Sequence, residues 1–448
     1  MFYSLKNIGA HKIFSIILGL TVFFLLIDPT PGQGKVYLDT ITNPGLAPFP
    51  VAVSDFTSPK RIDGQVAQNI QRTLINDLEI SGFFRVIKPE DFPDTAQIRA
   101  NLLDVSDFDA WNGSEVNVLV TGSFWVSGDS LLGSVRLYDL VEKKFLKGIR
   151  YEGKKAEWRR VAHQLANDVV LQISGEKGVF DTQIVFASNK TGNKEICLID
   201  VDGENLRQVT RNKSINILPR WTPDGKKILY TSYMKRNPDL YAIDLVSGNN
   251  YRISYRNGLN ACPTWLSDAE GEKMVLMLKQ DDRSHLFLTK VGDKGAIPLT
   301  SGSDNYASPS WSPDGKQITF VSDRSGTPQV YTMDKSGKNL KRITYQGNYN
   351  VSPAWSPKGD WIAFCGRQSG FFEIFLATPD GDRVRQLTRG PGNNEDPTWS
   401  PDGRYLAFSS TKEGGAAIYV MNINGTHQRK LTTLRGDATN PSWSPHLE

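Results

Sequence analysis

The sequence has few of the residues that metal-dependent and histidine-dependent catalysis require. Among 448 residues it holds only five His and three Cys, and these are widely separated. Neither C-x-x-C nor H-E-x-x-H occurs, so a zinc site or a His-based catalytic cluster has little material. We therefore expect no cofactor and no enzymatic activity of these two kinds.

No strong charge of either sign runs through the chain. Lys and Arg together number 52 against 48 Asp and Glu, which gives a formal net charge of +4. Such a weak field does not favour nucleic acid as a partner. Low-complexity tracts are also lacking, and 39% of the residues are hydrophobic, which is typical of a folded protein. The length suggests two or three domains.

The three cysteines are an odd number for an exported protein, and none has a near neighbour in the sequence. Cys197 and Cys365 lie inside apolar, strand-like runs. We expect buried free thiols that act as small hydrophobic residues, with a disulfide as the alternative.

Only one long hydrophobic run is present. Residues 13–27 are almost entirely apolar and follow a segment with basic residues but no acidic one. A membrane span needs about 20 apolar residues, so this shorter run fits a secretory signal better. We expect residues 1–34 to be a signal peptide, with an uncleaved N-terminal anchor as the alternative. Either way the remaining chain lies outside the cytoplasm, with no transmembrane segment after signal cleavage.

The second half of the chain repeats itself every 44 to 46 residues. Each repeat carries a Trp two residues after a Pro, and S-P-D-G or a variant of it follows in most repeats. The six tryptophans are Trp221, Trp265, Trp311, Trp355, Trp399 and Trp443. We expect them to form core between neighbouring repeats and not to bind a ligand.

Each repeat predicts four short strands. In one of them P-x-W-S is the first strand, and a P-D-G turn leads to the second at 318–322. A polar loop leads to the third at 329–334, and a Ser-Gly turn leads to the fourth at 342–344. Asp-Gly and Ser-Gly between apolar runs predict hairpins because Gly accepts the positive φ of tight turns. Four antiparallel strands at this period are typical of a β-propeller blade.

The number of second strands predicts six blades. The first repeat begins near Asp181 and lacks the P-x-W-S strand, whereas the last repeat consists of little else. We therefore predict that the C-terminal strand supplies the inner strand of the first blade and closes the ring. Asp224, Asp314 and Asp402 recur in the P-D-G turns, and turn formation alone accounts for them.

The first half predicts a small α/β domain. Strands are expected at 51–56, 83–87, 116–126, 131–138 and 144–151. One amphipathic helix follows Asp63, which we expect to cap it, and a second ends near Gly175. The predicted fold is thus an α/β N-terminal domain (35–176) followed by an all-β six-bladed β-propeller (177–448) that the C-terminal strand closes.

This order of parts resembles the TolB family over the whole mature chain. The resemblance is carried by the signal, the α/β domain, six blades with P-x-W-S-P-D-G or a variant of it, and the junction ANDVVLQISGEKGVFDTQIVFAS at 166–188. It implies a non-enzymatic periplasmic component of the Tol-Pal system, which supports outer-membrane integrity and invagination during cell division. The implied partners are the peptidoglycan-associated lipoprotein Pal, bound by the propeller, and inner-membrane Tol proteins such as TolA.

The mature N-terminus is the part that the resemblance assigns to the inner-membrane partner. It alternates apolar and polar residues and is therefore suited to add as a strand to an exposed sheet edge. A Pro-Gly break follows it, so we predict a hinged arm, with a plain edge strand of the α/β domain as the alternative. The arm consists of Lys35, Val36, Tyr37, Leu38, Asp39, Thr40, Ile41, Thr42 and Asn43.

The face for the lipoprotein is expected where each blade's outer strand connects to the next inner strand. The residue three positions before the Pro of each repeat lies in this connection, and it is usually Asn. Such an Asn either caps the turn into the inner strand or belongs to a ring of amides that is open to a partner. These six residues are Asn216, Asn260, Tyr306, Asn350, Asn394 and Ala438.

Charged residues are predicted on the same face. The loops between second and third strands carry Arg236, Arg283, Arg324 and Arg367, and Glu395 and Asp396 lie nearby. Arg and Asn at such a rim suit protein recognition. Glu395 and Asp396 are also the candidates for a cation in the channel, although two adjacent carboxylates are too few for a calcium cage.

Two other classes of propeller protein require motifs that can be sought in the sequence. A prolyl-oligopeptidase-like enzyme needs a Ser nucleophile in G-x-S-x-G, and no such motif occurs. A carbohydrate-active propeller needs paired carboxylates across a pocket, and the recurrent Asp residues are accounted for by turns. An exported propeller scaffold outside the Tol system, or a carbohydrate- or peptide-active propeller, is the alternative function.

Overall fold

The α/β domain is built on a five-stranded mixed sheet. The computed structural model describes residues 48–59, 63–93, 108–268, 271–280, 282–293 and 295–447. The strands are β1 (Phe49–Val53), β2 (Phe84–Ile87), β3 (Val118–Ser127), β4 (Ser130–Asp139) and β5 (Lys144–Lys154). Their order is β2-β1-β3-β4-β5, with β1 parallel to both neighbours and β3 to β5 antiparallel. The predicted strands of this domain are therefore confirmed. The expected signal (1–34) and arm (35–43) lie outside the described residues.

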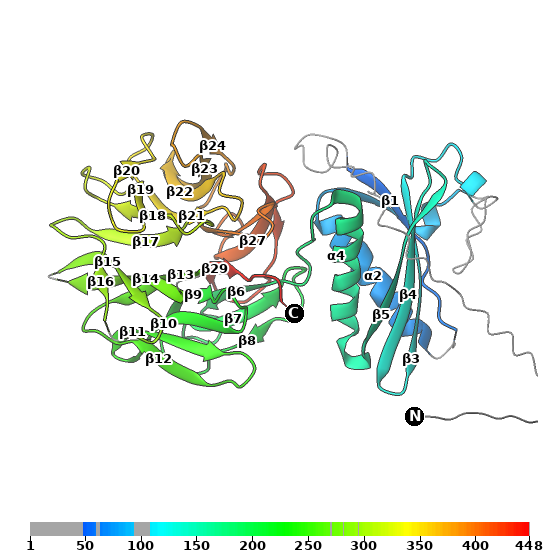
Figure 1. Cartoon of the computed structure of the whole chain (residues 1–448), viewed down its shortest axis with the longest axis horizontal. Helices are drawn as coiled ribbons and strands as arrows, with labels where there is room; N and C mark the ends of the chain where they lie inside the picture. The colour runs from blue at the N-terminus through cyan, green and yellow to red at the C-terminus, as the bar shows by residue number, and fades with distance from the viewer. Residues whose placement is uncertain are drawn as a thin grey trace, which may run out of the picture. The chain divides into compact units, whose positions relative to one another are not determined.

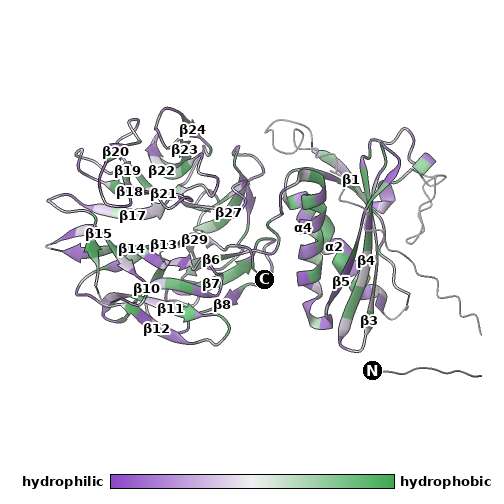
Figure 2. Cartoon of the chain, viewed as in Figure 1, coloured by the Kyte–Doolittle hydropathy of each residue, from purple (hydrophilic) through white to green (hydrophobic). Residues whose placement is uncertain are grey.

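Two amphipathic helices lie side by side along one face of this sheet (Figure 1). They are α2 (Gly64–Ile80) and α4 (Trp158–Ser174), and short 3-10 turns occupy Pro89–Asp91 and Lys155–Glu157. Figure 2 shows hydrophobic and hydrophilic residues alternating along both helices, as expected for elements with one buried side. Helix α4 ends at Gly175, whose φ of 76° is the left-handed conformation that Gly favours at this position.

The start of α2 corrects one expectation. Asp63 precedes the helix, but its side chain makes no capping hydrogen bond. Its Oδ2 atom instead accepts a hydrogen bond of 3.0 Å from the backbone N–H of Val126 in β3. A long-range partner that the local sequence does not reveal therefore takes the carboxylate away from the helix.

The strand residues divide between two hydrophobic cores. Val51 and Val53 of β1 are fully buried in the core that the helices cover. Ala52, between them, belongs to a second core with Phe108 and Trp111 on the opposite face. This alternation is the period of two expected of a strand that is buried on both faces.

Six four-stranded antiparallel sheets follow, which confirms the predicted blades (Figure 1). Strand order within each sheet runs from an inner to an outer strand. The first blade contains β29 (Ala438–Trp443), β6 (Gln183–Ser188), β7 (Glu195–Asp200) and β8 (Arg207–Gln208). The second contains β9 (Asn216–Trp221), β10 (Lys227–Lys235), β11 (Asn237–Asp244) and β12 (Asn250–Ser254). The third contains β13 (Asn260–Asp268), β14 (Gly271–Gln280), β15 (Arg283–Lys290) and β16 (Ile297–Pro298).

The remaining three blades follow the same order. The fourth contains β17 (Tyr306–Trp311), β18 (Gln317–Ser322), β19 (Gln329–Asp334) and β20 (Lys341–Arg342). The fifth contains β21 (Asn350–Trp355), β22 (Ile362–Gln368), β23 (Phe371–Ala377) and β24 (Val384–Gln386). The sixth contains β25 (Asn394–Trp399), β26 (Tyr405–Ser410), β27 (Ala417–Asn422) and β28 (Arg429–Lys430).

The C-terminal strand completes the first blade, as predicted. In the antiparallel pair of β29 and β6, Ala438 lies opposite Ser188 and Trp443 opposite Ile184. The same β29 contacts the inner strands β25 and β9 of the two neighbouring blades. Each inner strand therefore touches the next one around the ring, and the ring has no open edge at the join.

Every inner strand bulges at the residue before its Pro. These six residues have φ between 49° and 55°, and the pairing register shifts beside them. Pro has no N–H to give to the neighbouring strand, so the bulge falls where a ladder hydrogen bond is already missing. The six residues are Leu218, Cys262, Ser308, Ser352, Asp396 and Asn440.

The repeated tryptophans pack in the cores, as predicted, although Trp265 is only partly buried. That they bind no ligand stays a prediction. Trp221, Trp311, Trp355, Trp399 and Trp443 are all at most 8% exposed. Each belongs to a hydrophobic cluster with residues of a neighbouring blade, as Trp355 does with Val330 and Ile343. The three cysteines are buried and free, as expected.

The P-D-G turns form as predicted in the second, fourth and sixth blades. Asp314 Oδ1 accepts hydrogen bonds from Ser312 Oγ (2.7 Å) and Lys316 N (3.1 Å), and Gly315 has a φ of 66°. Asp224 and Asp402 accept equivalent bonds. The third blade, which reads W-L-S-D-A-E-G instead, extends β13 and β14 until Asp268 lies opposite Gly271.

Of the described helices, none combines the length and the apolarity that a bilayer crossing requires.

Candidate functional site

Two sets of loops share one face of the propeller. Because neighbouring strands of a blade are antiparallel, the connections from outer strand to next inner strand emerge beside those between second and third strands. We call this the loop face. The turns between first and second strands and between third and fourth strands form the opposite face. The four predicted Arg residues lie in or beside the second-to-third connections, and the Asn residues begin the inner strands.

The Asn side chains are engaged inside the fold. Asn216, Asn260, Asn350 and Asn394 are at most 4% exposed. Asn394 Nδ2 donates to Glu373 Oε2 at 2.9 Å, and Asn216 Nδ2 donates to Glu195 Oε2 at 3.0 Å. The capping role is therefore what the geometry shows. Tyr306 and Ala438, at the other two positions, are buried as well, and whether any of the six contributes to binding stays a prediction.

A buried polar triad accompanies three of these Asn residues, and sequence reasoning missed it. In the fifth blade, Glu373 Oε2 accepts from Asn394 Nδ2 and from Thr388 Oγ1 at 2.6 Å. The Thr388 hydroxyl in turn accepts from the backbone N–H of Ile374 at 2.8 Å. Glu195 with Thr210 and Gln329 with Thr344 repeat the arrangement. The 44-residue spacing from Gln329 to Glu373 and from Thr344 to Thr388 was the available signal.

The four Arg residues, in contrast, are exposed. Arg236, Arg283, Arg324 and Arg367 all lie at the surface. Among the described residues none of them forms an ion pair within 4.0 Å. The Arg324 guanidinium lies 6.0 Å from the ring centre of Tyr331. These four side chains are thus free to pair with acidic groups of another molecule.

Exposed aromatic side chains collect on the same face. Tyr255 and Tyr345 are 57% and 68% exposed, and both lie in connections that lead to an inner strand. The Arg252 and Arg342 guanidinium groups lie over their rings at 4.4 and 5.0 Å. Tyr233, Tyr349 and Phe371 add further exposed rings beside these loops. Aromatic and Arg side chains are the types that dominate protein interfaces.

Glu395 and Asp396 lie half-buried at the start of β25. Asp396 Oδ1 accepts from Ser352 Oγ at 2.8 Å, and its Oδ2 accepts from Asn440 Nδ2 at 2.7 Å. Burial, and to a lesser extent the charge of Asp396, raises the pKa of Glu395. Both oxygens of Asp396 are therefore already hydrogen-bonded, and a cation at this pair stays a prediction.

One buried cluster has the spacing of a metal site. Within the described part of the chain, only Asp77, His163 and Asp202 bring three such ligand atoms within 4.8 Å of one another. His163 Nδ1 lies 2.7 Å from Asp77 Oδ2, and Arg159 Nη2 donates to Asp202 Oδ2 at 2.5 Å. Because Arg159 also lies 3.3 Å from His163 Nε2, a cation is already in place. The contacts favour an ion-pair network over a metal.

This network binds protons more tightly when the protein is folded. Burial raises the pKa of Asp77 from 3.8 to about 6, in spite of the nearby His163. Burial opposes the charged form of His163, but the hydrogen bond and the charge of Asp77 outweigh it and raise the pKa of His163. The Oδ1 atom of Asp77 has no hydrogen-bond partner, which fits a carboxyl group that is costly to ionise.

Comparison with known proteins decides the family. The profile described as the TolB beta propeller domain matches residues 170–447, which is more than half of the chain. The chain belongs to the TolB family. The profile of the TolB amino-terminal domain matches residues 40–146. Members of this family are non-enzymatic, and the chain is not expected to be an enzyme.

Individual TolB proteins agree with this assignment. The "Tol-Pal system protein TolB" of Geobacter sulfurreducens is 38% identical over 224 residues, 48% of this chain and 49% of that protein. The protein of the same name from Geobacter metallireducens is 41% identical over 175 residues, 38% of this chain and 40% of that protein. The matched part thus spans half or less of these relatives' length.

A solved TolB structure has the same fold. The crystal structure of TolB from Acinetobacter baumannii superposes with a TM-score of 0.77 and covers 89% of this chain and 97% of that one. Its sequence identity is 23%, so this likeness concerns the fold alone. The resemblance to the TolB family that the sequence predicted is confirmed.

Proposed function

We propose that this TolB-family chain is a periplasmic, non-enzymatic component of the Tol-Pal system that binds a Pal-like lipoprotein through the loop face. Family membership carries the proposal, because the relatives are named for that system. The loop face supports it with exposed, unpaired Arg side chains beside exposed aromatic rings. An acidic, partly aromatic surface of the lipoprotein would complement it.

The first experiment removes two of the four Arg side chains. Arg324 and Arg367 lie on neighbouring blades and touch no described carboxylate, so their replacement by Ala breaks no ion pair within the fold. We expect the double variant to bind the soluble domain of the lipoprotein at least tenfold more weakly by calorimetry, because each charge-assisted contact contributes about 1 kcal/mol or more.

A matched control distinguishes contact from net charge. Lys226 and Lys338 are exposed in turns of the opposite face, and their replacement by Ala removes the same charge. This control should keep wild-type affinity, and both variants should keep the wild-type melting temperature. Equal affinity of the Arg double variant and the wild type would contradict the docking on the loop face.

The proposed second contact uses the N-terminal arm. Residues 35–43 would present a strand to a TolA-like inner-membrane protein, and lipoprotein binding would shift the arm between free and docked states only if the lipoprotein has different affinity for the two. Deletion of residues 35–43 should abolish the inner-membrane contact and leave lipoprotein binding intact. Loss of both contacts, or of neither, would leave the arm a purely structural element.

The cellular outcome proposed for both contacts is outer-membrane integrity and invagination during division. In a strain from which the gene has been deleted, the Arg324 and Arg367 double variant should leave cells that leak periplasmic enzymes and divide late. The Lys226 and Lys338 control should restore the wild-type phenotype to that strain. A double variant that fully restores a deletion strain, at equal protein level, would place the function on other residues.

A further inference from the structure

A cavity occupies the centre of the propeller, between the inner strands. Its volume is about 520 Å³, and its wall is made by the six P-x-W segments and the first residues of the turns that follow them. Pro223, Pro313, Pro357, Pro401 and Pro445 line the end on the opposite face. The lining extends from the bulge residues of the inner strands, among them Ser352 and Asp396, to these turns, and the cavity is within the size range of sites for organic ligands.

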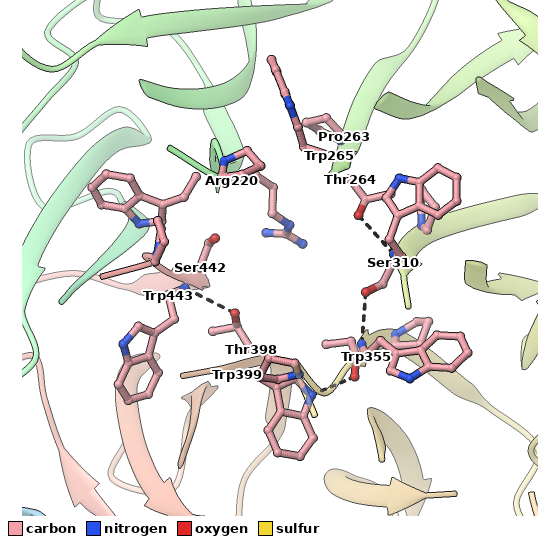
Figure 3. Close-up of a pocket in the computed structure, with 18 of the residues that line it drawn as sticks. Arg220, Pro263, Thr264, Trp265, Ser310, Trp355, Thr398, Trp399, Ser442 and Trp443 are labelled. Atoms are coloured by element: carbon pink, nitrogen blue, oxygen red, sulfur yellow. Dashed lines mark hydrogen bonds between the residues drawn. The ribbon is translucent and has the colours of Figure 1, made fainter. Parts of the chain in front are cut away.

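The residue between Pro and Trp points into this cavity from each blade. The six residues are Arg220, Thr264, Ser310, Ala354, Thr398 and Ser442. Four carry hydroxyl groups, one is Arg and none is acidic. Figure 3 shows the Arg220 guanidinium reaching towards the middle of the ring that these side chains form.

Three of the hydroxyl groups are held as hydrogen-bond acceptors. Thr264 Oγ1 accepts from the backbone N–H of Trp311 at 3.3 Å, and Ser310 Oγ accepts from that of Trp355 at 3.1 Å (Figure 3). Thr398 Oγ1 accepts from that of Trp443 at 3.3 Å. A hydroxyl that accepts in this way keeps its own proton to donate. None of the three donates to a described group, so these protons are available to a ligand in the cavity.

Arg220 is the charged donor of this ring. Its Nη1 donates to the carbonyl of Pro219 at 2.8 Å, and of its five N–H groups this is the one with a partner among the described residues. The carboxylate that lines the cavity is Asp396. Asp396 precedes Thr398 by two residues in β25, roughly 7 Å along the strand. Its two carboxylate oxygens already accept hydrogen bonds from Ser352 and Asn440. Arg220 has no described carboxylate within ion-pair distance.

We infer that this cavity binds a peptide carboxylate, with the oxyanion held by Arg220 and the neighbouring hydroxyl groups. Arg220 has no described carboxylate as an ion-pair partner, because the Asp396 oxygens already accept from Ser352 and Asn440. Donors that converge in this way favour an anion, since a guanidinium in a partly enclosed site is stabilised by an opposite charge. The cavity is several times larger than an inorganic anion, and its wall adds Pro and Trp surfaces that suit the rest of a peptide. Arg220 and the hydroxyl residues are not among those that the proposed lipoprotein contact uses, so the inference does not rest on the proposed function.

The test compares two peptides that differ in one charge. Acetyl-trialanine carries a free C-terminal carboxylate, and acetyl-trialanine amide does not. Each peptide is titrated into the full ¹⁵N-labelled chain, and binding is followed by the NMR signals of the indole N–H groups of the six repeat tryptophans that line the cavity. We expect the acid to bind at least tenfold more tightly than the amide. Equal binding of the two peptides, or no saturable shift with either, would overturn the inference.

Three variants assign the effect to this site. Arg220→Thr introduces the residue that two other blades carry here, and it should erase the difference between acid and amide. Arg324→Thr removes the same charge from the loop face and should leave the difference intact. Asp396→Asn should strengthen binding of the acid several-fold, because it removes a repelling charge, and Asn already occupies the equivalent position at Asn440. An acid preference that survives in Arg220→Thr would refute the assignment.

Inorganic phosphate distinguishes the kind of anion. If phosphate saturates the indole shifts and the peptide acid does not, the site takes a small oxyanion and the peptide assignment is wrong. Competition between phosphate and the peptide acid at a shared site, with the acid the tighter ligand, is the result that we expect.

Discussion

Replacing Trp443 by Phe should destabilise the propeller more than the same replacement at Trp221. The two side chains occupy equivalent positions and are 6% and 7% exposed, so the loss of ring volume is similar. They differ in their indole N–H. That of Trp443 donates to Thr182 Oγ1 at 2.8 Å, whereas that of Trp221 is buried and has no partner.

The magnitude follows from this difference. Phe at position 443 leaves a buried oxygen of Thr182 without its donor, which costs about 1–3 kcal/mol beyond the loss of volume. Phe at position 221 removes a polar group that had no partner, so no hydrogen bond is lost and a desolvation cost disappears. The free energy of unfolding should therefore fall by at least about 1 kcal/mol more for Trp443→Phe, which is about 2–4 °C in melting temperature for a domain of this size.

Urea unfolding followed by far-ultraviolet circular dichroism is the suitable assay, because backbone signal is insensitive to the removal of one fluorophore. The slopes of the two transitions should agree, so that the midpoints report stability. Equal midpoints, or a lower midpoint for Trp221→Phe, would refute the reasoning. They would also show that the bond between the C-terminal strand and Thr182 contributes nothing to closure of the ring.

Three further predictions concern stability. Folding raises the pKa of Asp77 from 3.8 to about 6 and also raises the pKa of His163, so the folded state holds more protons than the unfolded state. The contribution of this pair to the free energy of unfolding therefore falls as pH rises from about 4 through the folded pKa of His163. Melting temperatures from pH 5 to 8 should decline less in an Asp77→Asn, His163→Gln double variant than in the wild type, and an equal decline would contradict this. Gly337→Ala should lower the free energy of urea unfolding by more than about 2 kcal/mol, because φ is +80° and the new Cβ would lie 2.4 Å from the Leu299 carbonyl oxygen. Gly326→Ala, where φ is +93° and the space is open, should lower it by about 1 kcal/mol. Similar losses in the two variants would refute the clash. Glu373→Gln should lower the free energy of unfolding by no more than about 1 kcal/mol, because Gln329 accepts the equivalent hydrogen bonds in the preceding blade. Glu373→Leu should lower it by about 2–3 kcal/mol, because Thr388 and Asn394 lose their acceptor. Equal melting temperatures of the two variants would contradict the role of the triad.

Periodicity explains how much of the fold the sequence could predict. A repeat of 44 residues fixes strands, turns and blade number together, because every Pro, Trp and Gly is observed several times over. The unpaired first and last repeats likewise predict the join of β29 to β6. Where no repeat exists, as at Asp63, local spacing predicted a cap and a contact with Val126 took the side chain instead.

The site was harder to predict, because sequence position does not give the direction of a side chain. The recurrent Asn residues lie at the loop face as expected, yet their amides turn inward to Glu195, Gln329 and Glu373. Arg220 occupies a position that carries Thr, Ser or Ala in the other blades. Its departure from the repeat was visible in the sequence, but its place in the cavity appears only once the ring is closed.

Hydrogen–deuterium exchange with and without the lipoprotein's soluble domain tests the central claim most directly. Docking on the loop face predicts slower exchange of backbone amides at 233–237, 255–259, 345–349 and 367–371, where the exposed Arg and aromatic side chains lie. Amides of the opposite face, at 223–226 and 335–339, should exchange at unchanged rates. Protection of the opposite face with no change at the loop face would contradict the account.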